Sequence, residues 1–125
     1  KVDHVRRLAV DKLNDESILA EIARQDTSYD IRRDAVARVS NQQILIEIAR
    51  SDSVSEVRRA AVRKLTDQQI LLGIVRADSD GRVIEAAVES LTDETILGVL
   101  AGADDNENGA RDAARKRLYQ LKSSG

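Results

Sequence analysis

The sequence predicts an all-α fold, an α-solenoid of about four to five short two-helix repeats. One segment, of the type VRRLAVDKL, recurs with its first residues separated by 26, 26, 26 and 27 positions, at 5–13, 31–39, 57–65, 83–91 and 110–118. A second segment recurs between these copies, at 15–23, 41–49, 67–75 and 93–101. Such a fixed period is typical of an array in which each unit buries its apolar face against its neighbours.

The first recurring segment has the pattern of an amphipathic helix. In the third copy, Val57, Ala61, Val62 and Leu65 fall within an arc of about 140° when each residue advances by about 100°. Arg58 falls inside that apolar arc, where an unpaired charge is costly to bury, so it needs a partner. We therefore predict helices, called B segments, at 5–13, 31–39, 57–65, 83–91 and 110–121.

The second recurring segment also predicts a helix. Ile70, Leu71, Ile74 and Val75 share one arc of about 140°. We predict helices, called A segments, at 15–25, 41–51, 67–77 and 93–102. The residues expected to cap their N-termini are Asn14, Ser40, Thr66 and Thr92. Gln43 and Gln69 stand three residues after Ser40 and Thr66 and predict two capping boxes.

Composition limits the core and the class of protein. Hydrophobic residues make up 42% of the 125 residues, but Phe, Trp, Met, Cys and Pro are missing, so the core must be aliphatic. The length suits one repeat domain, 1–125, which the sequence also allows to be a fragment of a longer array. No apolar run approaches the roughly 20 residues that span a bilayer. We expect a cytoplasmic protein without membrane association.

The order of the two helices, with an Asp in the loop between them and V-R-x-A-A-x-x-L after it, resembles the HEAT-like repeats of α-solenoids. This resemblance covers residues 5–118 and implies a right-handed superhelix in which Asp and Arg form a ladder between successive repeats. The matching acidic residues are Asp26, Asp52, Asp78 and Asp104. The matching basic residues are Arg6, Arg32, Arg58 and Arg111.

The resemblance has departures. The 26-residue unit is shorter than the roughly 40–47 residues of typical HEAT or armadillo repeats, and it is closest to the compact HEAT-like repeats of phycobilisome lyases. Ile84 replaces the ladder Arg in the fourth B segment. Leucine-rich repeat variant proteins are an alternative at this period, but their usual prolines are missing here.

No set of residues predicts catalysis, a cofactor or a metal. His4 is the only histidine and has no recurring partner, which favours an exposed residue at a helix start. Residues 104–109, DDNENG, fit the opening of a calcium loop, but Arg115 stands where the bidentate Glu is required. We therefore expect a noncatalytic protein that binds no cofactor.

A row of arginines along the B segments is the candidate binding surface. Segments 3–13, 30–39, 56–65, 82–91 and 110–118 sum to +7, so the rest carries −9 to give the net charge of −2. We expect the outer ridge of these helices, on the concave side that the resemblance implies, to bind a partner through Arg7, Arg33, Arg38, Arg59, Arg63 and Lys64, with Glu85 and Glu89 closing the basic stretch.

The expected partner of this ridge is another protein or an acidic peptide. An alternative is a nucleic-acid-binding or lyase-type HEAT-like protein that uses the same ridge. The acidic net charge and the lack of aromatic residues within the ridge disfavour nucleic acid. Self-pairing of the ridge charges and end-to-end self-association of the array are further interpretations that the sequence leaves open.

Overall fold

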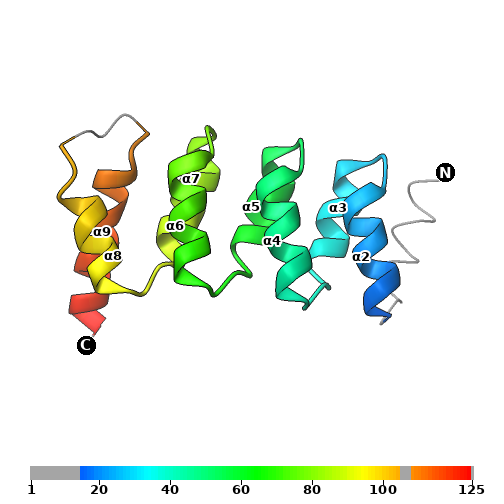
Figure 1. Cartoon of the computed structure of the whole chain (residues 1–125), viewed down its shortest axis with the longest axis horizontal. Coiled ribbons are helices and arrows are strands. Elements are labelled where there is room, and N and C mark those ends of the chain that lie inside the picture. Colours follow the sequence, from blue (N-terminus) through cyan, green and yellow to red (C-terminus); the bar gives the residue numbers. More distant parts are fainter. Residues whose placement is uncertain (1–14, 105–107, 125) are drawn as a thin grey trace. The chain divides into compact units, whose positions relative to one another are not determined.

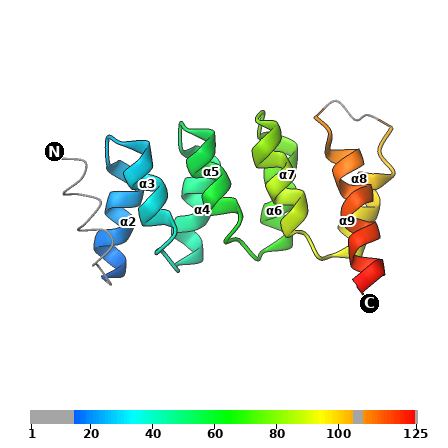
Figure 2. The same ribbon diagram turned by 180° about the vertical axis from the view of Figure 1, so that it is seen from behind.

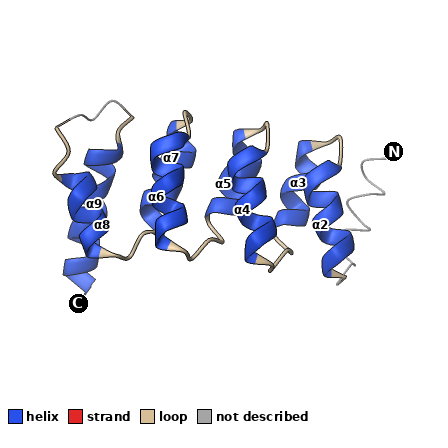
Figure 3. Ribbon diagram, in the orientation of Figure 1, coloured by secondary structure: helices blue, strands red, loops and turns tan. Residues whose placement is uncertain are grey.

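The computed structural model describes residues 15–104 and 108–124. All regular secondary structure in these two stretches is helical, without a strand, which confirms the all-α prediction (Figure 3). The B segment predicted at 5–13 lies outside the described residues, together with His4, Arg6, Arg7 and Asn14. The chain divides into two compact units, residues 1–64 and 65–125, which are described separately.

The described part of the first unit, residues 15–64, forms two helical hairpins. Its helices are α2 (Glu16–Gln25), α3 (Tyr29–Val36), α4 (Gln42–Ser51) and α5 (Ser55–Val62). Helix α2 packs against α3 and α4 against α5, and the two hairpins lie side by side (Figure 1). Contacts between the hairpins join α3 to α5 and α2 to α4, so each helix packs against the equivalent helix of the other hairpin.

The second unit repeats the hairpin arrangement. Its helices are α6 (Gln68–Ala77), α7 (Gly81–Ser90), α8 (Glu94–Ala101) and α9 (Ala110–Ser124). Helix α6 packs against α7 and α8 against α9, while α7 also packs against α9 (Figure 2). Gly109, with φ at 78°, supplies the left-handed turn that leads into α9, a conformation that residues with a Cβ rarely adopt.

The helices that form at the A segments, α2, α4, α6 and α8, are called A-type, and those at the B segments, α3, α5, α7 and α9, are called B-type. The N-caps of the A-type helices lie one residue later than the sequence predicted. The N-caps are Asp15, Asn41, Asp67 and Asp93, and each side chain accepts hydrogen bonds from backbone N–H groups two or three residues on. Ser40 and Thr66 were wrongly predicted as caps, and with them the two capping boxes. A carboxylate or amide one position closer to the helix reaches those N–H groups instead.

All four described B-type helices differ from their predicted bounds. Helix α7 begins two residues before 83 and ends one before 91, and α9 ends three residues after 121. Helices α3 and α5 begin two residues before 31 and 57, because a polar first turn precedes the apolar pattern. They end at Val36 and Val62, three residues before 39 and 65, because the chain tightens into bonds between residues three apart. Val39 and Leu65 still reach the core, with exposed fractions of 0% and 4%.

The core is aliphatic, as the composition predicts. Every buried residue of the described chain is Leu, Ile, Val or Ala. Val57, Ala61 and Val62 of α5 are fully buried, and Leu71 of α6 occupies the equivalent apolar face of its own helix. Helices of 8 to 10 residues are marginal alone in water, so this packing must hold them.

Candidate functional site

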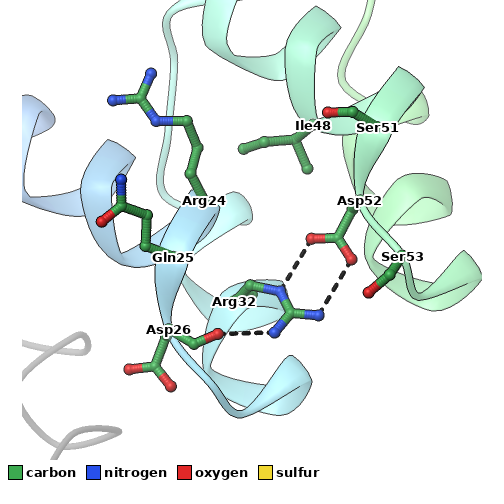
Figure 4. Close-up of a pocket in the computed structure, with 8 residues that line it drawn as sticks. All are labelled: Arg24, Gln25, Asp26, Arg32, Ile48, Ser51, Asp52 and Ser53. Atoms are coloured by element: carbon green, nitrogen blue, oxygen red, sulfur yellow. Dashed lines mark hydrogen bonds and ion pairs between the residues drawn. The ribbon is translucent and has the colours of Figure 1, made fainter.

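Arg32 and Asp52 form the central polar contact between the two hairpins of the first unit (Figure 4). Nε of Arg32 donates to Oδ2 of Asp52 at 2.9 Å, and Nη2 donates to Oδ1 at 3.2 Å. The third nitrogen, Nη1, donates to the backbone carbonyl of Asp26 at 2.7 Å. The two side chains are only 11% and 5% exposed, so this bidentate ion pair is shielded from water.

Each loop Asp also shapes the turn into the following helix. The carboxylate oxygens Oδ1 of Asp26, Asp52 and Asp78 accept from the N–H two residues on, at 2.9 Å in all three. This is an Asx turn, which stabilises the bend of the chain that precedes the next helix. Arg58 repeats part of the Arg32 geometry, because its Nη1 donates to the carbonyl of Asp52 at 2.8 Å.

The corresponding residues of the second unit are arranged differently. Ile84, which replaces the ladder Arg, is buried with an exposed fraction of 2%. Asp104 is exposed. Nη1 of Arg111 donates to the carbonyl of Asp104 at 3.3 Å, whereas its Nε is buried and has no hydrogen-bond partner among the described residues. Arg32 and Asp52 are thus brought together, while Arg111 makes only the backbone half of the contact.

A second series of contacts between repeats was missed by the sequence analysis. Oε2 of Glu16 accepts from the backbone N–H groups of Ser40 and Asn41, both at 2.9 Å. In the second unit, Oε1 of Gln68 accepts from the N–H groups of Thr92 and Asp93 at 2.8 and 2.9 Å. The available signal was the recurrence of an acid or amide every 26 residues at Glu16, Gln42, Gln68 and Glu94.

Charge contributes to the Glu16 contact. The hydrogen bond from the Asn41 N–H holds the pKa of the Glu16 carboxyl below its ordinary value, with smaller help from Ser40 and from the positive charge of Lys64. Burial of the carboxyl opposes this shift. The pKa of Lys64 is in turn lowered by burial, an effect that the nearby Glu16 carboxylate partly offsets.

Lys64 has a structural position. Its Nζ donates to the carbonyls of Val36, Ala37 and Val39, at 3.0, 2.9 and 2.5 Å, and so caps the C-terminus of α3. The three N–H groups of the ammonium are therefore used within the first unit, unlike the exposed cation that the sequence analysis expected. Arg117, at the matching repeat position of α9, donates from Nε to the carbonyl of Leu91 at 2.9 Å.

The other ridge residues differ in how much charge they leave free. Arg33 lies within 4 Å of three carboxylates, those of Asp30, Asp34 and Glu56. Arg38 is exposed and has a partner as well. Arg59, on α5, is half-buried and Arg63, the C-cap of α5, is exposed, and neither guanidinium group makes a hydrogen bond or an ion pair with the described residues of the first unit.

The acidic end of the predicted ridge is on α7 of the second unit, where Glu85 and Glu89 are both exposed. Cross-repeat pairing of these residues with Arg59 and Arg63 stays a prediction. Among the described residues, no three His, Cys, Asp or Glu side chains gather as metal ligands would. Part of the calcium-like segment, 105–107, lies outside the described residues.

The first unit contains an open pocket of about 330 Å³ around the ladder pair. Figure 4 shows Arg24, Arg32 and Asp52 along its wall, with Ile48 at its apolar side. Arg24 also pairs with Glu47, its Nη1 lying 3.3 Å from Oε1. The charges that line this pocket are balanced, because two arginines, Arg24 and Arg32, and two aspartates, Asp26 and Asp52, line it.

Comparison with protein-family models, with curated proteins and with solved structures finds no match in any of the three cases.

None of the helices in the described stretches is both long and apolar enough to cross a bilayer.

Proposed function

We propose that this chain is a noncatalytic protein-interaction scaffold, an α-solenoid of HEAT-like repeats whose B-type helices bind an acidic segment of another protein. The observation that carries this proposal is the state of Arg59 and Arg63. They lie in and directly after one helix, α5, and none of the hydrogen bonds or ion pairs among the described residues of the first unit uses their guanidinium groups.

The neighbouring cations support a narrower binding surface than the sequence suggested. Arg33 is surrounded by three carboxylates, and Lys64 donates to three carbonyls. Neither is then available for a partner without breaking contacts within the unit. Arg59 and Arg63 can pair with acidic side chains at no such cost, and an arginine offers a planar set of N–H donors that fits a carboxylate.

The repeat architecture supports a scaffold. Short hairpins related by a 26-residue period, joined by Arg32–Asp52 and Glu16–Asn41 contacts, present equivalent helices at regular intervals. Arrays of this type characteristically bind extended partners along one row of helices. The HEAT-like assignment adds the expectation that this row is the B-type helices.

The test is binding of a fluorescent glutamate-rich peptide to the full chain, measured by anisotropy. The variant R59A/R63A should bind at least about tenfold more weakly, because two charge-assisted contacts are lost. The matched control, R24A/R50A, removes the same charge from the A-type helices and should bind like the unsubstituted chain. Equal losses in both variants would show a general charge effect and refute the ridge.

A second arm separates peptide from nucleic acid. Retention of the chain on a DNA resin at about 150 mM salt would favour nucleic acid, since phosphate contacts weaken steeply as salt rises and only a surface adapted to the nucleic-acid backbone still binds at that ionic strength. We expect the chain to pass through. Circular dichroism of R59A/R63A should show unchanged helix content, because neither guanidinium makes a contact that holds the first unit together.

A further inference from the structure

The second unit contains an open pocket of about 520 Å³ at the C-terminal end of α6 and the start of α9. Val75 and Leu100, exposed by 1% and 8%, provide apolar surface. Its polar lining comes from Arg76, Ser79, Asn108 and Arg111. The volume lies in the range of small-molecule sites, and the combination of an apolar floor with a few polar groups is typical of them.

The described lining of this pocket carries unbalanced charge. Two arginines line it, and none of the described residues that line it has a carboxylate. The pocket of the first unit has two arginines as well, but Asp26 and Asp52 line it with them. Two differences in the second unit accompany this: the spacing between the last two B segments is 27 residues instead of 26, and Asp104 is exposed, whereas its counterpart Asp52 contacts Arg32.

Arg111 has an unused donor. Its Nη1 makes the same backbone contact as that of Arg32, to the carbonyl of the loop Asp. Its Nε is buried without a hydrogen-bond acceptor among the described residues, and Oδ1 of Asp112 stands 3.8 Å away. The equivalent Nε of Arg32 donates to Asp52 at 2.9 Å. Arg111 is therefore the Arg32 arrangement without its carboxylate.

The pocket wall is held in place by Asn108. Its Nδ2 donates to the carbonyl of Val75 at 3.2 Å, and its Oδ1 accepts from the N–H of Ala110 at 3.1 Å. The end of α6 and the start of α9 are tied together by this one side chain. A ligand thus meets a preformed site and need not order the wall, which lowers the entropic cost of binding.

We propose that this pocket binds a carboxylate group, which Arg111 and Arg76 hold. Carboxylate is favoured over phosphate because the same repeat position, Arg32, binds a carboxylate through two of its nitrogens in this structure. The carboxylate comes either from a small organic acid or from an acidic side chain of a bound peptide. This site does not involve α5, so the ridge of Arg59 and Arg63 can fail its test without affecting it.

The experiment follows the arginine Nε–H signals of the full ¹⁵N-labelled chain by NMR during titration. The probes are glutarate, a short peptide with one central Glu, and inorganic phosphate, all at matched ionic strength. We expect saturable shifts at Arg111 and Arg76 with both carboxylates, and the tighter of the two identifies the source. R111K should bind about tenfold more weakly, because lysine cannot offer two fixed donors.

R76Q is the second variant, since Arg76 is exposed and its loss should not affect folding. It should weaken carboxylate binding, whereas R24Q, the same substitution at the matching position of α2, should leave binding unchanged. Shifts that never saturate, affinities unchanged in both R111K and R76Q, or phosphate bound more tightly than either carboxylate would each overturn the proposal.

Discussion

At the scale of single residues, Arg32 and Asp52 show how a charge is kept inside an aliphatic array. All three guanidinium nitrogens donate, and the Asp52 carboxylate also accepts from the N–H of Val54. Removing one member of such a shielded pair costs about 3–5 kcal/mol, because the other charge stays buried without a partner, whereas replacing both charges by apolar residues is often neutral. At the same repeat position in the second unit, Ile84 is buried with an exposed fraction of 2%, and Asp104 is exposed, so no charge is left buried there.

The Glu16 contact predicts a specific pH response. Its folded-state pKa is lowered, so its contribution to stability is present above the unfolded value of about 4.3 and is lost as the pH falls through the folded pKa. E16Q should keep the contact, because Gln68 shows that an amide oxygen accepts the equivalent N–H groups. We therefore expect E16Q to have near-normal stability at neutral pH and to lose less stability than the unsubstituted chain as the pH falls.

Urea unfolding as a function of pH measures this response. E16A, which removes the acceptor, should lose about 1 kcal/mol at pH 7, the usual net value of such hydrogen bonds. Its remaining stability should depend less on pH in acid than that of the unsubstituted chain. If E16Q loses stability in acid as steeply as the unsubstituted chain, Glu16 is not the titrating group and the argument fails.

At the scale of helices, the N-cap decides where an A-type helix begins. Oδ1 of Asp93 accepts from the N–H groups of Thr95 and Ile96, at 2.9 and 3.1 Å. D93A should therefore destabilise the chain by about 1 kcal/mol. T92A is the matched control at the residue that the sequence analysis chose as the cap, and it should cost much less, because the Thr92 contact to Gln68 uses the backbone N–H.

Thermal unfolding of the two variants, compared with the unsubstituted chain, measures the difference. If T92A loses as much thermal stability as D93A, the hydrogen bonds of the Asp93 side chain are not what stabilises the start of α8.

The helices were predictable because their apolar periodicity is local. The spacing of Val57, Ala61 and Val62 predicts α5 without reference to any neighbouring helix, and all three residues are buried in the structure. The cap was wrongly predicted at Thr92 and lies at Asp93, because both side chains are good acceptors and only the backbone conformation separates them. The tightened turn after Val36 could not be predicted either, because the apolar pattern that ends at Val39 fits both an α-helix and the tighter turn.

The candidate sites needed distances that the sequence does not contain. Lys64 looked like an exposed cation, but it reaches the carbonyls at the end of α3 because α3 and α5 pack side by side. Likewise, the recurrence of Glu16 and Gln68 was visible, although their loop partners, 24 and 25 residues later, were not. Contacts between repeats depend on how the hairpins are spaced, and that spacing follows from packing.

At the scale of the whole molecule, a repeat array and a compact globule respond differently to a cavity. In an array each hairpin is stabilised mainly by its neighbours, so damage should weaken with distance along the chain. Leu45 of the first unit and Leu71 of the second occupy equivalent positions and are both fully buried. Replacement of either by alanine removes the same side chain from the same environment, and each should cost about 2–5 kcal/mol locally.

Hydrogen exchange of backbone amides, followed residue by residue, distinguishes the two cases. We expect L45A to lower protection most in α2–α5 and L71A to lower it most in α6–α9, because each cavity is felt first by the helices that line it. In a single cooperative globule every protected amide exchanges through the same global opening, so both variants would lower protection uniformly from α2 to α9. That uniform result would contradict the repeat array on which the scaffold proposal rests.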